Sequence, residues 1–556
     1  MKEKDNIFLV ASKIVGALEK VFPEIEPSNE EYQGSALRKE CYNFQLVFKN
    51  LQENTIKIDA VKIESDIAKN VLLRLVDSVP VTRIPTQYRD DYYLSDKVGL
   101  YPDVLRPLNE FDIVLPPAQW KAVWVSIDID ESIEVGEHKL KFIALDKNGD
   151  EITNLTYTLE VINAVALKQN LKKSNWMHYD CIANYHNVEV FSESFYKIFD
   201  EYLKAYTHCG FNMLLTPLFT PPLDTEIGLE RRTAQLVNVE FTNGEYHFDF
   251  SALEKFLDFV MSRGIEYIEF SHLFTQWGGA FAPKIMANVD GAYQRIFGWE
   301  DESCGEKYSS FLDAFLPKLV QFIDKKALRG KCYFHLTDEP RTKDLSTYEK
   351  CQALVKKHIG DLPTIDALSD YSFYEKRLVD IAVPIIDVAQ NFIDKGIEDL
   401  FVYYCCWPTN DYYSNRLINM PSQRTRILGL QLYLNQAIGF LHWGFNFYNS
   451  AYSYYSIDPY RNTDAGGYFP SGDSFIVYPT EKGVNLSLRA EVIADSFQDY
   501  NALKLLESLI GKEKVLELLK KEKLQGFSVY PHNNKWHYEF RRKINELIKE
   551  QSKIFN

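Results

Sequence analysis

Two neighbouring carboxylates, Asp338 and Glu339, are the residues of this chain whose placement best suits catalysis. Their adjacency alone means little, because 78 acidic residues among 556 predict roughly 11 acid-acid neighbours by chance. Their position is more informative: the apolar run Cys332–Thr337 precedes them, and Pro340 follows where an extended strand has to end. Barrel enzymes place their reactive groups at the carboxyl ends of strands, so we expect the pair to face a binding cavity.

The adjacency of the two carboxylates narrows the chemistry that they can perform. Inverting and ordinary retaining glycosidases place two carboxyl groups on opposite faces of the sugar, about 5 to 9.5 Å apart. Sequence neighbours cannot easily do this, but they suit a substrate whose own 2-acetamido oxygen attacks the anomeric carbon. In such a reaction Glu339 would protonate the leaving oxygen and later deprotonate water, while Asp338 would accept a hydrogen bond from the acetamido N–H.

Short apolar runs separated by helical patterns begin near residue 175 and indicate alternating strands and helices. Eight runs are interpreted as strands, which is the number in a (β/α)8 barrel. They are Met177–Asn184, Asn212–Pro217, Tyr267–His272, Cys332–Thr337, Thr364–Leu368, Val383–Ala389, Phe401–Trp407 and Gly439–Asn446. One intervening helix is expected to begin with a capping box at Ser251–Glu254 and to end at Gly264.

The sequence predicts three domains. Residues 1–168 are β-rich and are expected to form a β-sandwich. Residues 169–490 are expected to form the catalytic barrel, and residues 491–556 a helical extension that packs on the barrel. The predicted fold is therefore multidomain, with an N-terminal β-sandwich, a (β/α)8 TIM-type barrel and C-terminal helices.

Aromatic and polar residues near the ends of the predicted strands are the candidates for binding a substrate. Trp407 and Trp443 end the seventh and eighth strands, where indole rings can wall a pocket or simply pack in the barrel. Trp277 precedes two glycines in a predicted rim loop, where a plain turn is the competing interpretation. Further candidates, each with a structural role as the alternative, are His178, His272, Asn212 and Asn391.

The charge of the chain argues against polyanionic partners. Its net charge is -16 and its pI about 5.3, so nucleic acid and anionic membrane surfaces would be repelled. No run approaches the roughly 18 apolar residues of a membrane span, and the stretch from Met1 to Leu18 lacks the features of a signal peptide. The eight cysteines include no Cys-x-x-Cys pair and are interpreted as reduced core residues. We expect a cytoplasmic protein, and its oligomeric state stays open.

The segment His335–Arg341, with the sequence HLTDEPR, resembles glycoside hydrolase family 123. Trp443-Gly444 at a later strand end and the segment Phe475–Tyr478 resemble the same family, and the resemblance covers roughly residues 1 to 530. It implies a β-sandwich followed by a barrel, and cleavage of terminal β-linked N-acetylgalactosamine with retention by substrate assistance. Members carry an adjacent Asp-Glu pair, so the resemblance gives Asp338 and Glu339 the two catalytic roles.

The resemblance also implies a tyrosine that binds the acetamido oxygen. Tyr371, just after the fifth predicted strand, is the position that we match to it, and Tyr374 is close enough to compete. No cofactor and no metal are implied, and the sequence has no His-Glu-x-x-His pattern or cysteine cluster. The expected partner is a small glycan ending in β-N-acetylgalactosamine, plausibly of the glycolipid type.

Two other interpretations stay open at this point. The same Asp-Glu pair would serve a β-N-acetylglucosaminidase, because the two sugars differ only at the 4-hydroxyl. A non-catalytic carbohydrate-binding protein could present the same aromatic cleft.

Overall fold

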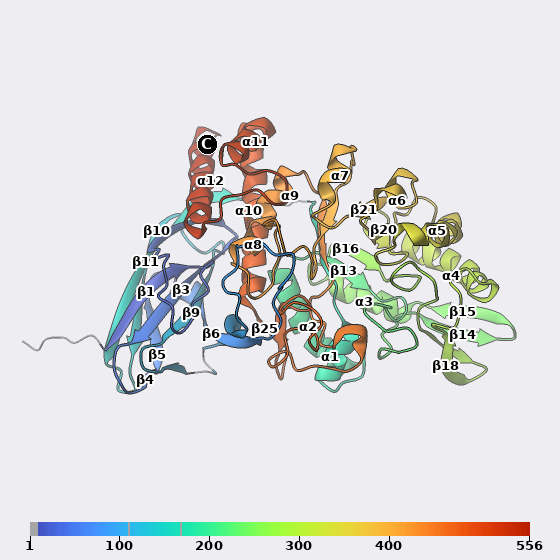
Figure 1. Ribbon diagram of the computed structural model, residues 1–556, viewed down its shortest axis with the longest axis horizontal. Helices are drawn as coiled ribbons and strands as arrows, with labels where there is room; N and C mark the ends of the chain where they lie inside the picture. Colours follow the sequence, from blue (N-terminus) through green and yellow to red (C-terminus); the bar gives the residue numbers. More distant parts are fainter. Residues whose placement is uncertain (1–8, 109, 111, 167–169, 556) are drawn as a thin grey trace, which may run out of the picture. The chain divides into compact units, whose positions relative to one another are not determined.

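The computed structural model describes residues 9–108, 110, 112–166 and 170–555 (Figure 1). Its contacts divide the chain into two compact units. The first comprises Met1–Gln169, Thr409–Asn435 and Asn485–Asn556, and the second comprises Asn170–Pro408 and Gln436–Val484. Two predictions fall on residues that the structure does not describe. They are the domain limit at 168/169 and the start of the N-terminal stretch that was searched for signal-peptide features. The three predicted domains therefore stay a prediction.

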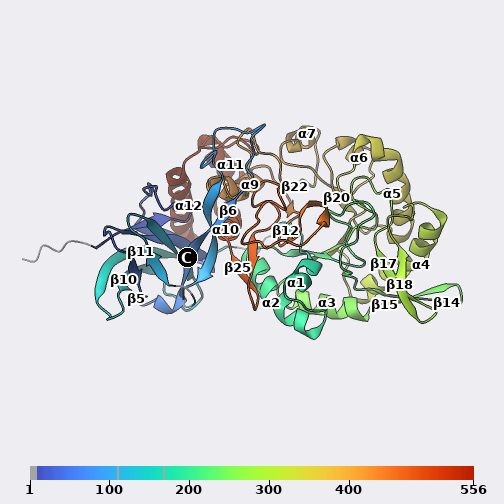
Figure 2. The same ribbon diagram turned by 60° about the horizontal axis from the view of Figure 1, so that its bottom comes forward.

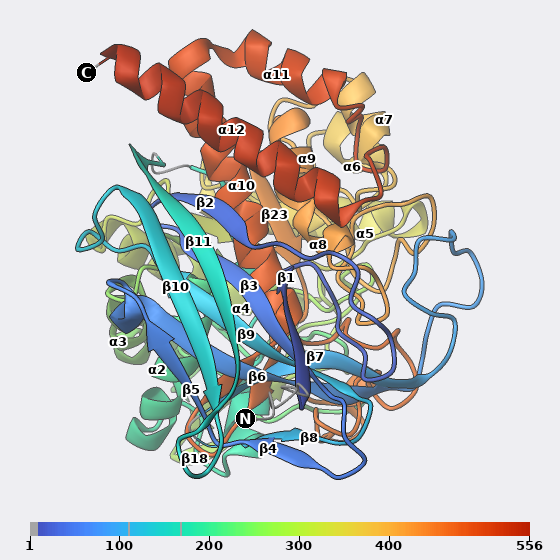
Figure 3. The ribbon, with the colours of Figure 1, turned by 90° about the vertical axis from the view of Figure 1, so that its left-hand side faces the viewer.

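The first unit contains two sheets that share one hydrophobic core (Figure 3). One sheet has the strand order β1-β3-β9-β6-β7 and the other β2-β11-β10-β5. In the core Phe44 of the first sheet stacks on Tyr157 of the second, with 4.1 Å between ring centroids. The strands of this unit are β1 Val10–Gly16, β2 Gln33–Arg38, β3 Cys41–Asn50, β4 Ile56–Ile58, β5 Ala60–Glu64, β6 Val71–Val81, β7 Gly99–Pro107, β8 Ile113–Leu115, β9 Trp120–Asp128, β10 Gly136–Leu145 and β11 Glu151–Val165. The N-terminal region is thus rich in sheet, as predicted.

Strand β9 has buried side chains on both of its faces. Val123 and Val125 belong to the core between the two sheets. Trp120 and Trp124 point to the opposite face, where they pack with Val492 of helix α10. This helix therefore covers a face of the sheet that the second sheet leaves free.

The C-terminal helices lie in this first unit, a position that the sequence did not predict. Helix α10 contacts β3 and β7, and α12 contacts β2 and β11. A buried ion cluster joins the helices: Asp499 of α10 accepts hydrogen bonds from Arg426 at 2.8 and 3.1 Å and from Arg541 of α12 at 2.9 Å. Burial alone would raise the pKa of Asp499, but Arg426 and its other partners hold it well below the usual range. The helices are α8 Gln423–Arg426, α9 Leu428–Leu434, α10 Leu488–Ile510, α11 Lys512–Lys521 and α12 Asn534–Phe555.

The second unit contains a curled parallel sheet in the order β19-β16-β13-β12-β23-β22, six strands among the described residues (Figure 2). Strands β20 and β21 form a separate parallel pair. Single bridges, Phe334 with Thr364 and Ile385 with Tyr403, connect the pair to the two edges of the sheet. The structure thus has a six-stranded half-barrel with a two-stranded pair bridged to its edges, and the (β/α)8 barrel stays a prediction. The strands are β12 Lys172–Asn175, β13 Met213–Thr216, β16 Tyr267–Phe270, β19 Cys332–Phe334, β20 Ile365–Ala367, β21 Ile381–Val383, β22 Phe401–Tyr403 and β23 Gly439–His442.

The first of the predicted strands was wrong. Met177–Asn184 overlaps helix α1, and the strand at this place is β12, five residues earlier, with the sequence Lys-Lys-Ser-Asn. Its polar residues hid it from a search for apolar runs, although Ser174 and Asn175 are fully buried. The other predicted strands overlap strands of the structure, but Val383–Ala389 does so only at Val383, because α7 begins at Ala389.

The helices of this unit alternate with its parallel strands. The capping box predicted for α3 is wrong: Phe250 is the N-cap, and Ser251 donates instead to Asp249, from Oγ at 2.7 Å. A small sheet with the order β15-β14-β17-β18 was not predicted. The helices and extra strands are α1 Tyr179–Tyr185, α2 Glu193–His208, β14 Asn238–Thr242, β15 Glu245–Asp249, α3 Ser251–Met261, β17 Ile285–Val289, β18 Ala292–Phe297, α4 Glu306–Lys325, α5 Leu345–Ile359, α6 Tyr371–Glu375 and α7 Ala389–Asp394.

Within the described ranges, none of the helices combines the length and the apolar character that crossing a bilayer requires.

The ion cluster predicts a large loss of stability on replacing Arg426 by methionine. The substitution leaves the buried Asp499 with fewer counter-charges, and breaking a buried pair costs about 3 to 5 kcal/mol. Urea unfolding followed by tryptophan fluorescence should show the transition at a clearly lower urea concentration. Lys62→Met, which breaks the exposed pair with Glu64, is the control and should leave the midpoint unchanged. An unchanged midpoint for Arg426→Met would contradict this account of the cluster.

Candidate active site

A cavity of about 780 Å³, partly open to solvent, lies in the second unit, where the strands of the half-barrel end. Asp338 and Glu339 both line it, and so do Trp277 and Trp443. Four of the residues singled out from the sequence are therefore brought together at one cavity.

The backbone of the Asp-Glu pair is held by segments on either side of it. The Trp277 N–H donates to the carbonyl of Asp338 at 2.7 Å, and the Glu339 N–H donates to the carbonyl of Ala367 in β20 at 3.0 Å. Glu339 has a φ of +45°, in the left-handed region that residues with a Cβ rarely adopt. Consecutive side chains of an extended strand point to opposite faces, so this turn allows both carboxylates to line the same cavity.

Tyr403, at the end of β22, forms a direct contact with the pair. Its hydroxyl donates to Glu339 Oε1 at 2.6 Å. Burial and the nearby Glu339 carboxylate raise the pKa of Tyr403 well above its usual value, so the phenol keeps its proton and remains a donor. Burial, followed by the charge of Glu339, also raises the pKa of Asp338 well above its usual range.

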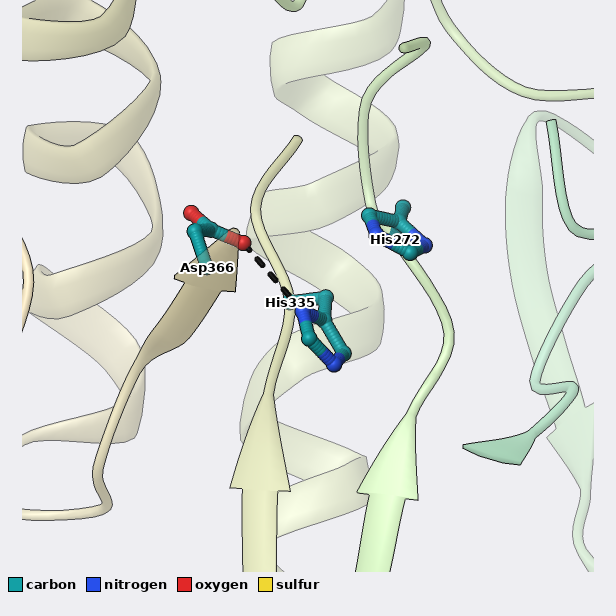
Figure 4. Close-up of side chains that lie close together, drawn as sticks. All are labelled: His272, His335 and Asp366. Atoms are coloured by element: carbon teal, nitrogen blue, oxygen red, sulfur yellow. Dashed lines mark hydrogen bonds and ion pairs between the residues drawn. The ribbon is translucent and has the colours of Figure 1, made fainter. Parts of the chain in front are cut away.

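A series of buried polar contacts begins at the cavity wall and includes the contact between His335 and Asp366 (Figure 4). Trp176, which lines the cavity, donates from Nε1 to Glu269 Oε2 at 3.0 Å. His335 Nε2 lies 2.8 Å from the same oxygen, and its Nδ1 lies 3.4 Å from Asp366 Oδ1. Tyr348 donates to the other oxygen of Asp366 at 2.6 Å. These contacts thus join β16, β20 and α5 around His335, the residue that follows β19.

His272, His335 and Asp366 bring potential metal-ligand atoms within 4.8 Å of one another. Both ring nitrogens of His335, however, already face carboxylate oxygens. The imidazole of His272 stacks on that of His335, with centroids 4.5 Å apart and planes at 23°, so the two rings lie face to face and do not point at a common centre (Figure 4). These contacts describe a protonated histidine between two acids, and we assign no metal to the cluster.

Two tryptophans that were predicted from the sequence form walls of the cavity. Trp443 donates from Nε1 to Asp473 Oδ2 at 3.1 Å. Trp277 is 41% exposed and packs edge to face on Tyr452, with 5.8 Å between centroids. Glycine is required directly after it, because Gly278 has a φ of +108° and a Cβ there would lie 2.5 Å from Asp344 Cγ.

Four other predicted residues do not line this cavity. Trp407 donates to Asp387 and packs in the core of the half-barrel. Asn212 bonds the backbone of Lys173 at 2.8 Å, at the opposite end of the strands. His178 is buried and contacts the Trp443 carbonyl from Nε2 at 2.9 Å, and His272 stacks on His335, as described above.

Tyr371 and Asn391 line a second, more open cavity of about 1230 Å³. Glu339 and Tyr403 belong to the lining of both cavities. The ring of Tyr371 is covered on one side by Lys395, whose Nζ lies 4.2 Å from the ring centroid. The position matched to the acetamido oxygen therefore lies on the other side of Glu339 from the first cavity's tryptophans.

Several cavity residues were missed by the sequence analysis. They are Tyr403, Asp224, Gln276, Tyr452, Tyr468 and Phe469. Asp224 Oδ2 accepts a hydrogen bond from the Tyr452 N–H at 3.1 Å, and burial raises the pKa of Asp224 to about 6. Only Tyr403 carried a usable signal, since it lies within the seventh predicted strand. The others lie in loops, where no periodic pattern marks the residues that turn inward.

Comparison with known proteins agrees with this architecture. The family model "Glycoside hydrolase 123, catalytic domain" matches residues 176–506. A family 123 glycoside hydrolase from Clostridium perfringens, described for its hydrolysis of glycolipid glycans, has a TM-score of 0.71 at 15% identity, covering 98% of each chain. That likeness extends the shared fold over both units.

Other solved structures are much less similar to this chain. A putative beta-galactosidase from Bacteroides fragilis has a TM-score of 0.30 at 11% identity, over 88% of this chain and 60% of its own. A family 5 mannosidase from Rhizomucor miehei has a TM-score of 0.32 at 12% identity, over 63% and 94%. No curated protein sequence matches the chain significantly.

The matched segment covers more than half of the chain and includes every residue that has been placed at the first cavity. The resemblance of HLTDEPR to one family, the position of its Asp-Glu pair and the match to the catalytic domain agree. The chain belongs to glycoside hydrolase family 123.

Proposed function

We propose that this glycoside hydrolase removes a terminal β-linked N-acetylgalactosamine with retention, through an oxazolinium intermediate. The observation that carries the proposal is that Asp338 and Glu339 line one cavity from a single turn of the chain. Carboxyl groups on consecutive Cα atoms, about 3.8 Å apart, are poorly placed to flank an anomeric carbon on both faces. A 2-acetamido oxygen supplied by the substrate removes the need for a second carboxylate on the opposite face.

In this mechanism Glu339 is the acid and then the base. The acetamido oxygen attacks the anomeric carbon, the bond to the leaving oxygen breaks, and the proton of Glu339 moves to that oxygen. Water then attacks the anomeric carbon and gives a proton to Glu339, while the oxazolinium ring opens to restore the acetamide. Tyr403 binds Glu339 Oε1, which leaves Oε2 for both proton transfers.

Asp338 acts on the acetamido group in the same mechanism. Its carboxylate accepts the acetamido N–H and stabilises the positive charge that forms on the oxazolinium ion. Trp443 and Trp277 offer apolar faces to the sugar ring in the same cavity.

The leaving group lies in the second cavity. An acid that protonates the glycosidic oxygen has to lie between the sugar and the leaving group, and Glu339 and Tyr403 line both cavities. We therefore assign Tyr371 and Asn391 to the leaving group, in place of the acetamido contact that the family resemblance implied for Tyr371. The large second cavity supports an oligosaccharide leaving group, which is consistent with a glycolipid-type glycan.

We also propose the finer parts of the architecture. Bridges at both edges of the β20–β21 pair support a (β/α)8 barrel completed by these two strands. The shared core of the two N-terminal sheets supports a β-sandwich. All eight cysteines carry free thiols, which supports a cytoplasmic location.

Loss of the two carboxylates should abolish most of the activity. On nitrophenyl β-N-acetylgalactosaminide, Glu339→Gln should lower kcat by about 100- to 10,000-fold, and Asp338→Asn by about 100- to 1,000-fold. Glu349→Gln, which alters an exposed acid of α5, is the control and should retain the wild-type rate. If the wild-type protein cleaves neither this compound nor its N-acetylglucosamine counterpart, the proposed hydrolysis of these sugars is wrong. A higher rate on the N-acetylglucosamine compound would make N-acetylglucosamine the preferred sugar.

The Tyr403 hydroxyl should contribute about one hydrogen bond to a carboxylate. Tyr403→Phe is therefore expected to lower kcat/KM by about 10- to 100-fold on the same substrate. Tyr333→Phe alters a tyrosine of the same core cluster that does not line the cavity, and its kcat/KM should stay near wild type. Equal losses in the two variants would indicate that packing, and not the bond to Glu339, explains the effect.

The leaving-group assignment predicts an effect that depends on the substrate. Tyr371→Ala should lower kcat/KM about tenfold on an oligosaccharide, because contacts beyond the cleaved bond are lost. On N-acetylgalactosaminyl fluoride, whose leaving group is a single atom, the rate should be unchanged. Equal losses on both substrates would place Tyr371 against the N-acetylgalactosamine instead.

A further inference from the structure

His335 is a fully buried histidine three residues before Asp338, and it lies between two fully buried acids. Nε2 is 2.8 Å from Glu269 Oε2 of β16, and Nδ1 is 3.4 Å from Asp366 Oδ1 of β20. The two acids belong to the strands on either side of β19. One side chain thus connects both neighbours of the strand that leads to the Asp-Glu pair.

The two carboxylate contacts require a protonated ring. A neutral imidazole has one N–H and one lone pair, so one of its nitrogens would direct a lone pair at an anion. An imidazolium donates on both sides and balances one of the two buried negative charges. Burial alone would lower the pKa of His335, but the hydrogen bonds to Asp366 and Glu269 raise it to about 9.

The other groups around His335 reinforce this charge state. Trp176 donates to Glu269 and Tyr348 of α5 donates to Asp366, so both acids have neutral donors besides the imidazolium. Burial and the charge of His335 lower the pKa of the stacked His272 well below its usual value, which keeps that ring neutral. The positive charge of this cluster is therefore carried by His335.

The charge of His335 acts on the nearby Asp338. Burial, Glu339, Asp366 and Asp224 all raise the pKa of Asp338, and His335 lowers it. In the proposed mechanism Asp338 has to be ionised when the acetamido group attacks. The backbone contacts of the pair come from the residues after β16 and from β20, which are the same segments that His335 connects.

We propose that His335 is a positioning residue of the reaction: a buried imidazolium that fixes the turn carrying Asp338 and Glu339 and favours the ionised form of Asp338. The second part rests on the proposed function. A buried imidazolium in this place differs from an ordinary core histidine, because its charge as well as its volume is needed for these two roles.

The pH dependence of kcat/KM tests the role of the charge. His335→Gln keeps a hydrogen-bonding side chain of similar length and removes the cation. Loss of a nearby positive charge favours the protonated form of Asp338, so the acidic limb of the bell-shaped profile should move to higher pH, by about one unit. Activity at the acidic end should then fall about tenfold more than at the maximum. If kcat/KM of His335→Gln is lower at every pH but the limbs of its profile do not move, the proposal is overturned.

Two further variants separate charge from packing. His272→Gln alters the stacked neighbour, which carries no charge, and should leave both limbs where they are in wild type. Glu269→Gln keeps the volume and removes an anion of the same cluster in place of the cation, so it should not move the acidic limb to higher pH. If His272→Gln moves the limbs as far as His335→Gln does, the effect is structural and the proposal fails.

Nitrogen NMR of the wild-type protein labelled at histidine gives a measurement that needs neither activity nor a folded His335 variant. We expect His335 to retain protons on both ring nitrogens at about pH 8, where an ordinary histidine is neutral. A ring with a single N–H at that pH would overturn the proposal. Absence of hydrolysis together with a doubly protonated ring would instead contradict the proposed function and leave the imidazolium established.

Discussion

Both carboxylates can reach one cavity because the backbone turns into the left-handed region at Glu339. Without this turn, neighbouring side chains would point to opposite faces of the strand, and only one acid would face the substrate. A non-glycine residue in this region costs about 1 to 3 kcal/mol, and the chain offsets this by holding the turn on both sides. The carbonyl before it accepts from Trp277, and its own N–H donates to Ala367. The strain is therefore placed where the surrounding hydrogen bonds leave no alternative conformation.

The buried contacts around His335 explain how such a site withstands its own negative charge. Asp338, Glu339, Glu269 and Asp366 lie close together, and burial opposes the ionised form of each acid whose pKa is clearly raised. Surface cations could not compensate, because solvent would screen them. A cation enclosed among the acids is not screened in this way. His335 is such a cation, and it lies directly after β19 in the segment that carries Asp338 and Glu339.

The sequence was sufficient for features that depend on local pattern, and insufficient for those that depend on distant partners. The Asp-Glu pair could be located because an apolar strand ends directly before it. Strand β12 could not be found, since its buried Ser174 and Asn175 are polar and a search for apolar runs does not detect them. Asp224 and Tyr452 lie in loops whose course depends on each other. Helix α10 falls within the predicted helical extension, but nothing in its own residues indicates that it covers Trp120 and Trp124.

The arrangement of the chain also constrains how the protein is made. The chain alternates between the two units four times, from Gln169 to Asn485, before the last helices are reached. The ribosome therefore releases the N-terminal sheets long before α10, which covers the outer face of β9. During synthesis, at about 5 to 20 residues per second, Trp120 and Trp124 remain uncovered for the time needed to translate more than half of the chain. The outer face of β9 is thus completed last, so truncation near the C-terminus is expected to harm the first unit more than the second.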